Sequence, residues 1–493
     1  MAMTSLIPVQ NIERVEIVKG AASTAWGAAL GGVVNIITKE PNTGRPVSGM
    51  VSGSVGSKFT ADSRAELSGT VDRLGYYLTA GNIHSDGLTP NTATNLNNLY
   101  GKLVYRLPSS GTATIGFSQL DVRSGMDEGN TVQWGWVHDN AENHHTSGFL
   151  KFSQPLGAKL TLDLDGFFRN NDDHMKYGGL DGQGAVTFFN DNATTEKYRG
   201  ANARLTWGDG QHNLVAGVEY GHVHGVTGDL LNPPPNYDLT WDSWGFYANG
   251  ALTIDRLTII PGIRYDLTGI AGDITSYSLG ATYRLYESTT LRAYGAQGYS
   301  LPRPNTNGEL QKVKTIQGGI ESGVVPYLWL KGTYFFNSMR NNDLQASNTF
   351  VNQDRQGFEI EARTTPFYNV SLATGYTYLH AKNADTGEEL KTNSDQSVPS
   401  QVVKLALNYN KADLGLRGVL TGNYVWWNSP TGYQSESGMI WDLHLNWKLM
   451  PKSELSPELF FSGHNLFNGV QTTGTELYTN PSRWYDGGLR VRF

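Results

Sequence analysis

The feature that most limits how this chain can fold is a residue-by-residue alternation of apolar and polar side chains. It recurs from about residue 47 to the end, as where Leu160 and Leu162 alternate with Thr161 and Asp163. Successive side chains of a strand point to opposite faces, so the pattern predicts strands that each have one apolar face. Helical periodicity of 3.6 residues is hard to find. Marking the alternating segments predicts about 22 strands, each using roughly 20 residues together with its connection.

The connections between these segments alternate in length. Tight connections are predicted at 72–73, 108–110, 157–158, 208–210, 286–288, 366–367 and 411–413. Long connections are predicted at 85–95, 123–144, 171–194, 225–239, 300–310, 381–398, 428–437 and 466–483. Soluble sandwiches and propellers do not separate short from long connections in this way, whereas a membrane barrel has short turns at one rim and long loops at the other. We therefore predict an all-β fold, a transmembrane antiparallel β-barrel.

Composition agrees with a barrel and excludes several other classes. The mean hydropathy is −0.38 and no run of 18 apolar residues occurs, which excludes a helical membrane protein. Charged residues make up only 17%, while 58 Gly, 25 Tyr, 18 Phe and 12 Trp suit tight turns and aromatic girdles. The chain has no Cys, so disulfides and thiolate metal sites are excluded. The net charge of −7 and the lack of a basic tract exclude nucleic acid as a partner.

The C-terminal residues predict how the barrel closes. Arg490 and Arg492 lie on one face of a final strand. The other face carries the apolar and aromatic residues Tyr485, Leu489, Val491 and Phe493. A closed barrel requires its last strand to pair with its first, and we expect this strand to do so. We also expect these four residues to be the assembly signal that the outer-membrane insertion machinery reads.

Residues 7–40 have a different pattern, a strand followed by a glycine-punctuated loop and a second strand. Alone this stretch buries too little surface to fold independently. It closely resembles the end of the plug domain of TonB-dependent outer-membrane receptors. Further segments resemble that family in the same order, namely 299–304, 357–361, 376–379, 463–468 and 481–493. The resemblance covers essentially the whole chain.

The resemblance implies a plug remnant over residues 1–40 and a barrel over residues 41–493, in the outer membrane of a Gram-negative bacterium. It implies uptake of a scarce metal chelate, driven when the inner-membrane TonB complex pulls a TonB box on the plug. The first hundred or so plug residues are not in this sequence, and residues 1–5 show no export signal. We expect TonB to act on this chain only if those parts are supplied. The plug loop is expected to use Lys19, Gly20, Gly27, Gly31 and Gly32.

The same resemblance implies a lock between plug and barrel wall. Arg14 and Glu16 stand where the family places locking charges, and Glu359 and Gln317 are the matching barrel positions. Buried opposite charges must be paired to be tolerated, so we expect Arg14 to pair with Glu359. Gln317, where the family usually has Glu, is expected to weaken one contact.

The outer loops hold most of the residues that could bind a ligand. Aromatic rings can stack on a planar ligand, and imidazoles can bind a metal or an organic chelate. The candidates are Trp134, Trp136, His138, His144, His145, His174, His222, His224, Tyr237, Trp241, Trp244 and Arg303. The alternative reading is that they are ordinary polar loop residues and interfacial aromatics. The identity of any metal is left open. We expect no cofactor, and a Ca²⁺ site is left as an idea because the full loop pattern for calcium is missing.

Several functions remain open at this point. A ferric siderophore is the first expectation for the substrate. Cobalamin is the second, because the barrel is compact for the family that the chain resembles. No His falls in 299–310, which argues against haem. A passive diffusion pore is the alternative if the plug is incomplete, and an adhesin or phage-docking surface is compatible with transport. No G-x-S-x-G, H-E-x-x-H or clear Ser/His/Asp set occurs, so we expect no enzyme.

Overall fold

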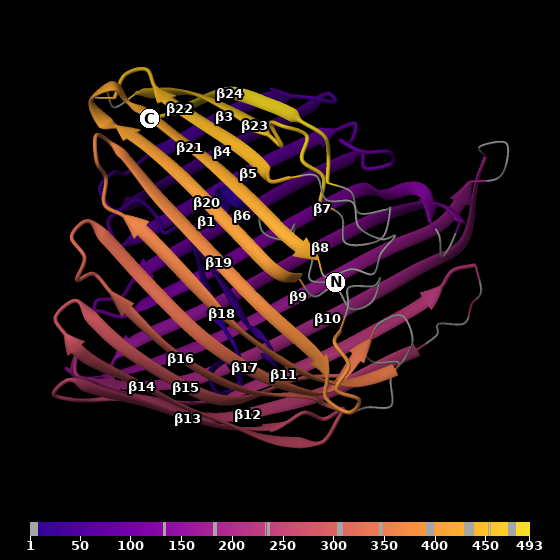
Figure 1. The fold of residues 1–493 in the computed structure, drawn as a ribbon. Helices are drawn as coiled ribbons and strands as arrows, with labels where there is room; N and C mark the ends of the chain where they lie inside the picture. The colour runs from indigo at the N-terminus through magenta and orange to yellow at the C-terminus, as the bar shows by residue number, and fades with distance from the viewer. Residues whose placement is uncertain are drawn as a thin grey trace.

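A computed structural model gives the fold over most of the chain (Figure 1). It describes residues 8–131, 135–180, 185–231, 233, 237–302, 309–344, 349–390, 399–427, 438–451, 453, 455–471 and 480–493. Within these residues, 22 strands, β3 to β24, form one closed barrel in which each strand pairs with its neighbours in sequence. All the pairings are antiparallel. The predicted fold class and strand number are therefore confirmed.

The barrel strands are of unequal length. The first eleven are β3 (Ser48–Gly56), β4 (Thr60–Val71), β5 (Leu74–Ser85), β6 (Thr94–Arg106), β7 (Thr112–Thr131), β8 (Gly135–Pro155), β9 (Leu160–Leu180), β10 (Val186–Gly208), β11 (His212–Asp229), β12 (Tyr237–Ile254) and β13 (Leu257–Leu267). The others are β14 (Asp273–Tyr286), β15 (Thr289–Ser300), β16 (Gln311–Ser322), β17 (Leu328–Leu344), β18 (Thr349–Thr364), β19 (Val370–Asn383), β20 (Pro399–Lys411), β21 (Leu416–Trp427), β22 (Ile440–Lys448), β23 (Ser456–His464) and β24 (Trp484–Arg492).

The barrel closes between its last and first strands. β24 pairs with β3 from Asp486 opposite Gly56 to Arg492 opposite Met50. Phe493 extends the seam, because its N–H donates to the Gly49 carbonyl at 3.1 Å and its own carbonyl accepts from the Gly49 N–H at 2.9 Å. The closure predicted from the final strand is confirmed. Whether Tyr485, Leu489, Val491 and Phe493 act as an assembly signal stays a prediction.

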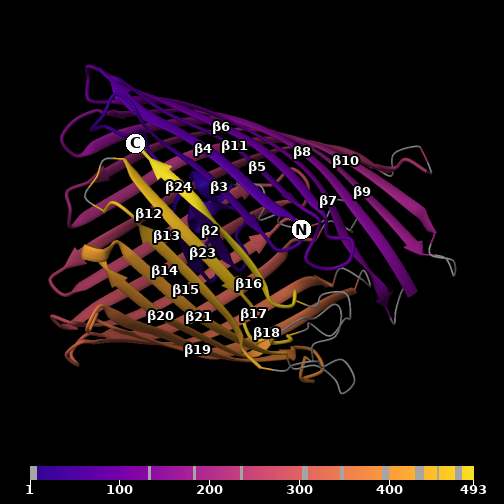
Figure 2. The ribbon, with the colours of Figure 1, turned by 90° about the horizontal axis from the view of Figure 1, so that it is seen from above.

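Tight turns occupy one rim of the barrel, on the left in Figure 1, as the alternation of connection lengths predicted. The other rim differs from expectation, because residues 123–144, 171–194 and 225–239 lie largely in β7 to β12 rather than in loops. These strands are 18 to 23 residues long, and β7 to β10 project at the outer rim in Figure 2. The physical reason is that both faces of a strand above the membrane are solvated, so no apolar alternation marks it in the sequence.

Exposure alternates along the strands and identifies the outward face. On β12, for example, Trp244, Phe246 and Leu252 are exposed, whereas Gly245 between two of them is buried. The exposed apolar residues form the surface that faces lipid in a membrane barrel, and the residues between them face the lumen.

The N-terminal segment, residues 8–47, precedes the barrel. It holds a 3-10 turn η2 (Val9–Asn11), strand β1 (Ile12–Lys19), the one-turn helix α1 (Ser23–Trp26) and strand β2 (Gly32–Thr38). A second 3-10 turn, η3 (Ala412–Leu414), lies between β20 and β21. Among the described residues, no helix is long and apolar enough to cross a membrane.

Candidate functional site

The N-terminal segment forms a hairpin of its own, separate from the barrel sheet. β1 and β2 pair antiparallel, with Lys19 opposite Gly32 at the end that carries the loop of residues 20–31, here called the apex loop. Gly32 has φ 141°, and a Cβ there would lie 2.3 Å from the Val18 carbonyl oxygen. Only glycine tolerates both conditions, so this residue permits the hairpin to turn into the apex loop.

One end of the segment is held by the strands that follow it in sequence. The Gln10 side chain donates to Asn98 on β6 at 2.9 Å, and Thr79 on β5 donates to Asn11 at 2.6 Å. Asn11 is 1% exposed, so its amide depends on such partners. These contacts fix the base of the hairpin to β5 and β6.

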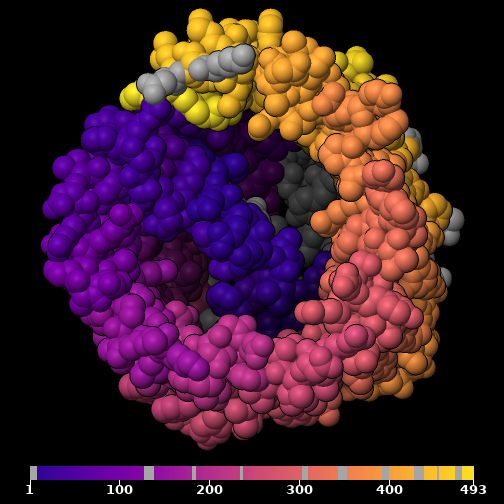
Figure 3. All heavy atoms as spheres, turned by 90° about the vertical axis from the view of Figure 1, so that its left-hand side faces the viewer, coloured from indigo at the N-terminus to yellow at the C-terminus, as the bar shows by residue number. Residues whose placement is uncertain are grey.

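The apex loop is held by the other side of the barrel, on β12 to β15. Tyr294 donates its hydroxyl to the Ala21 carbonyl at 2.7 Å, and the Tyr299 N–H donates to the Ser23 hydroxyl at 3.0 Å. Figure 3, seen from the rim with tight turns, shows the segment in indigo crossing the lumen between the two walls. The hairpin is thus a strut across the barrel, attached at both ends.

A buried ion cluster lies under the apex loop. Arg264 on β13 bonds to Asp266 at 2.7 Å and to Glu219 on β11 at 2.9 Å, and its side chain is 4% exposed. A Cβ on Gly27 would lie 3.2 Å from the Arg264 guanidinium. The loop therefore approaches this cation with bare backbone, which is the close contact that a glycine at position 27 allows.

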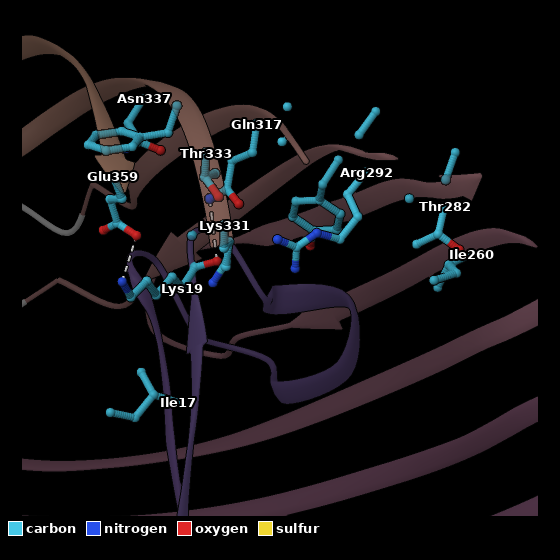
Figure 4. A pocket seen from close by; sticks show the side chains of 18 of the residues that line it. Ile17, Lys19, Ile260, Thr282, Arg292, Gln317, Lys331, Thr333, Asn337 and Glu359 are labelled. Carbon is cyan, nitrogen blue, oxygen red and sulfur yellow. Dashed lines mark hydrogen bonds and ion pairs between the residues drawn. The ribbon is translucent and has the colours of Figure 1, made fainter. Parts of the chain in front are cut away.

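A cavity of about 520 Å³ lies between the hairpin and the wall formed by β13 to β18 (Figure 4). Its polar lining includes Lys19, Gln317, Arg292, Lys331 and Glu359. The Lys19 ammonium bonds to the Glu359 carboxylate at 2.7 Å, as the dashed line in Figure 4 marks. Gln317 donates weakly to the Lys19 carbonyl at 3.4 Å. The contact between hairpin and wall is therefore made at the end of β1.

The expected pair of Arg14 with Glu359 is not formed, and Lys19 takes that position. Arg14 bonds instead to Glu16 at 2.9 Å and lies 3.6 Å from Glu13. The Arg14 hydrogen bond, followed by one from Asn35, lowers the pKa of Glu16 below its ordinary value. Residues two apart on a strand share a face, so Arg14 and Glu16 satisfy each other within the hairpin. The sequence motif places Lys19 in the plug loop and does not indicate that it is the partner of Glu359.

Replacing Lys19 by alanine is expected to loosen the hairpin slightly. Lys19 is 59% exposed, and ion pairs of this kind contribute about 0.2–1 kcal/mol, so proteolysis of residues 8–40 should accelerate up to about fivefold. Arg14→Ala serves as the matched control and should leave the rate unchanged. Timed digestion of both variants and of Glu359→Gln measures this. A larger effect from Arg14→Ala than from Lys19→Ala would contradict the assignment.

The candidate ligand residues divide between the two faces of the wall. Trp134 and Arg303 lie outside the described residues, and Trp136 is described only in its backbone, as part of β8. By strand alternation, His145 on β8 and Tyr237 and Trp241 on β12 face the lumen. The outward set is His138, His144, His174, His222, His224 and Trp244. The sequence did not separate these groups because their strands were expected to be loops.

The outward histidines are largely engaged by carboxylates on neighbouring strands. His144 bonds to Asp121 at 2.7 Å, and His222 bonds to Asp242 at 2.9 Å. Within the described part of the chain, no group of three or more His, Cys, Asp or Glu side chains is arranged to hold a metal ion. The Ca²⁺ idea and any other metal site therefore receive no geometric support from these residues.

Comparison with known proteins decides the family. The family description "TonB dependent receptor-like, beta-barrel" matches residues 65–466, which is most of the chain. This chain belongs to the TonB-dependent receptor family. Members are transporters rather than enzymes, lie in the outer membrane of Gram-negative bacteria, bind small-molecule ligands and interact with TonB. The resemblance noted from the sequence motifs is confirmed.

Solved structures share the fold of this receptor at low sequence identity. Pseudomonas aeruginosa FpvA, in an iron complex with a heterologous pyoverdine, is 17% identical with a TM-score of 0.82, covering 100% of this chain and 78% of that one. The siderophore receptor PiuA from Acinetobacter baumannii is 14% identical with a TM-score of 0.80, covering 98% of this chain and 87% of that one. The ferric-catecholate import receptor Fiu from Escherichia coli K12 is 15% identical with a TM-score of 0.76, covering 98% of this chain and 86% of that one. A search of curated proteins finds no match.

Proposed function

We propose that this receptor takes up a ferric siderophore with energy from TonB, and that the N-terminal segment is the last part of its plug. The observation that carries the proposal is the hairpin attached to opposite walls of the lumen, at Asn98 on β6 and at Tyr294 on β15. Such a strut narrows the path through the barrel. Its attachments are a few hydrogen bonds of about 0.5–1.5 kcal/mol each, which a mechanical pull can break.

The lumen offers chemistry that suits an anionic, aromatic-bearing iron chelate. Arg169 on β9 lies over the Tyr198 ring at 5.6 Å and bonds to Glu196 at 2.6 Å while remaining 45% exposed. Trp241 lies on the inner face of β12 and on the same register row of the sheet, because it is opposite Val223, which is opposite Tyr198. A guanidinium can pair with an anionic chelate, and an aromatic ring can stack on a planar group. The siderophore class also agrees with what the names of PiuA and Fiu say those proteins bind.

A passive diffusion pore is the second candidate. Figure 3 shows the segment as a band across the lumen that does not fill it, and a cavity of about 520 Å³ lies between the hairpin and the wall of β13 to β18. Steady single-channel conductance in planar bilayers, without any energy source, would favour this function over gated uptake.

Ligand binding tests the first candidate directly. Purified receptor in detergent should be titrated with ferric complexes of a hydroxamate, a catecholate and citrate, with the iron-free chelators and cyanocobalamin alongside. We expect one ferric complex to bind and its iron-free chelator to bind far more weakly. Binding of cyanocobalamin alone would replace the siderophore by cobalamin, and no binding together with free conductance would establish the pore.

Trp241→Ala should weaken binding of that ferric complex about tenfold, because an aromatic contact contributes roughly 0.5–1.5 kcal/mol. Trp244→Ala is the matched control on the same strand, since Trp244 faces outward and is 44% exposed. Equal losses in both variants would show that the effect does not come from the lumen. Calorimetric or radiolabelled-iron titration gives the two affinities.

A further inference from the structure

Arg355 on β18 is a cation of the lumen wall that has no carboxylate partner among the described residues. It shares a strand face with Glu359, whose carboxylate bonds to the hairpin at Lys19, so its side chain lies on the lumen side of the wall. Six other arginines on the lumen face each have a carboxylate within 3.6 Å, namely Arg64, Arg169, Arg204, Arg264, Arg292 and Arg490. Arg355 therefore departs from the pattern of its own barrel.

A neutral amide holds the Arg355 guanidinium in place. The Nε and Nη2 groups of Arg355 donate to the Gln353 side-chain oxygen at 3.0 and 2.7 Å. Gln353 is 1% exposed, so this contact is fixed within the wall. The amide orients the guanidinium without neutralising it, and Nη1 has no hydrogen-bond partner in the described part of the chain. The charge and part of the donor set of Arg355 are therefore available to a ligand.

The two strands beside Arg355 present apolar side chains on one side and an amide on the other. Ala381 lies opposite Arg355 on β19 and packs against Leu390, and both are buried. Asn337 lies opposite Arg355 on β17, and its side-chain oxygen accepts from the Thr315 hydroxyl at 2.8 Å, which leaves its amide nitrogen as a donor. Arg355 itself is half-buried. A cation in such surroundings is unfavourable until an anion pairs with it.

The acids of this part of the lumen are already paired. Among the described side chains on the lumen faces of β17 to β19, the acids are Glu359 and Glu361. Glu359 bonds to Lys19 at 2.7 Å, and Glu361 bonds to Lys331 at 3.1 Å. Glu359 is also four residues from Arg355, which is about 13 Å along a strand. An anion that reaches Arg355 therefore meets no competing carboxylate among these residues.

Arg355 lies on the same register row as the seat of the apex loop. Asn337 is opposite Arg355, Thr315 is opposite Asn337, and the Thr315 hydroxyl accepts from the Ala21 N–H of the loop at 3.4 Å. Neighbouring strands are about 4.8 Å apart, so Arg355 is roughly 10 Å from this contact. The apex loop, residues 20–31, contains no charged residue, and Asn337 also lines the cavity beside the hairpin (Figure 4). One ligand can therefore contact both the loop and Arg355.

We propose that Arg355 binds a carboxylate group of the ligand that this receptor takes up, with the Asn337 amide as a second donor. A guanidinium matches the planar geometry of a carboxylate and forms charge-assisted hydrogen bonds with it. The inference rests on the proposed uptake of a ferric siderophore and narrows the substrate class to anionic complexes that carry a carboxylate. Bound there, the ligand lies beside the apex loop, the part of the strut that is held by the opposite wall from its base.

Titration of the purified receptor with ferric citrate and with a neutral ferric trihydroxamate tests the role of Arg355. We expect ferric citrate to bind more tightly, and Arg355→Gln to weaken its binding about 10- to 150-fold, because hydrogen bonds to a charged group are lost. Arg355→Lys keeps the charge without the planar fork and should recover part of the affinity. Arg363→Gln is the matched control, since Arg363 shares the strand and the face, is 62% exposed and leaves Glu361 paired with Lys331. It should change the affinity less than about twofold.

A second measurement uses an iron-free probe and reports on Arg355 directly. Tricarballylate, a tricarboxylate without iron, should slow the modification of Arg355 by phenylglyoxal several-fold, as followed by peptide mass spectrometry. The modification of Arg363 in the same molecules should not change. Heat-modifiable mobility checks that each variant is folded.

The outcomes separate this inference from the proposed function. A ferric complex that the parent and Arg355→Gln bind equally well would overturn the role of Arg355 and leave ferric uptake standing. Equal losses in Arg355→Gln and Arg363→Gln would overturn it in favour of diffuse charge. Protection of Arg355 by tricarballylate without binding of any ferric complex would support the carboxylate site and overturn the ferric substrate. No protection and no binding would overturn both.

Discussion

Gly298→Val is expected to expel the apex loop from its seat and to leave a barrel that conducts ions. Gly298 on β15 faces the lumen, and a Cβ there would lie 2.9 Å from the Ala21 Cβ and 3.0 Å from the Ala29 carbonyl oxygen. Valine favours strands, so the barrel itself should tolerate it. The loop must move instead, and overpacking of this kind costs about 1–3 kcal/mol.

The displacement should also break the bonds that hold the loop to this wall. The Tyr299 N–H would lose the Ser23 hydroxyl, and the Tyr294 hydroxyl would lose the Ala21 carbonyl. Because the parent also loses these bonds when its loop detaches, only the overpacking shifts the equilibrium, and about 1–3 kcal/mol makes the detached state roughly 5- to 150-fold more populated. The attachment of residues 8–19 to β5 and β6 should remain.

Planar-bilayer conductance and timed proteolysis within residues 20–31 measure the release. Gly295→Val is the matched control on the same strand, because its Cβ would face outward and come no closer than 3.9 Å to the Thr315 carbonyl oxygen. The control should keep the conductance and cleavage rate of the parent. An unchanged conductance in Gly298→Val would mean that the strut does not limit passage.

Gly488→Val is expected to prevent the barrel from closing. Gly488 lies in the seam strand β24, and a Cβ there would lie 2.2 Å from the Gly53 carbonyl oxygen on β3 and 2.7 Å from the Phe460 ring. The first contact is with backbone, so β24 cannot pair with β3 in the register that joins Leu489 to Gly53. An open seam exposes two strand edges, and each unsatisfied backbone group in lipid costs several kcal/mol.

The fraction of protein with heat-modifiable mobility after refolding into lipid vesicles reports closure. We expect at least about a tenfold fall for Gly488→Val, because several backbone bonds are lost together. Gly53→Val lies on the partner strand at the same seam, but its Cβ would meet nothing within 4 Å and would face lipid. The control should fold like the parent. Normal folding of both variants would show that the seam can shift register at little cost.

The barrel could be predicted from the sequence because membrane strands carry a strong signal. Lipid on one side and water on the other force alternation, as in the run from Leu160 to Asp163, and the two rims separate short turns from long connections. The same signal fails where both faces meet water. The outer halves of β7 to β10 are therefore strands that read as loops, and the predicted loop at 123–144 is a long hairpin.

The candidate site depended more on tertiary structure than on sequence. Arg14 and Glu359 were natural partners by motif, but pairing within the hairpin engages Arg14 with Glu16 and leaves Glu359 to Lys19. Alternate residues of a strand face opposite sides of the barrel wall, so Trp241 and Trp244 on β12 face in opposite directions. This assignment is possible only once the strand and its register are known.

By itself the sequence determined the fold class, the strand number, the closing strand and the family, since each follows from local periodicity or from motifs that a single stretch of chain carries. Tertiary structure decided which charges meet, how the N-terminal segment crosses the lumen, and which of the candidate residues face the lumen and which face outward. The physical reason is that register and long-range contacts, such as Ser23 with Tyr299, are set by the packing of the whole barrel. No local pattern records them.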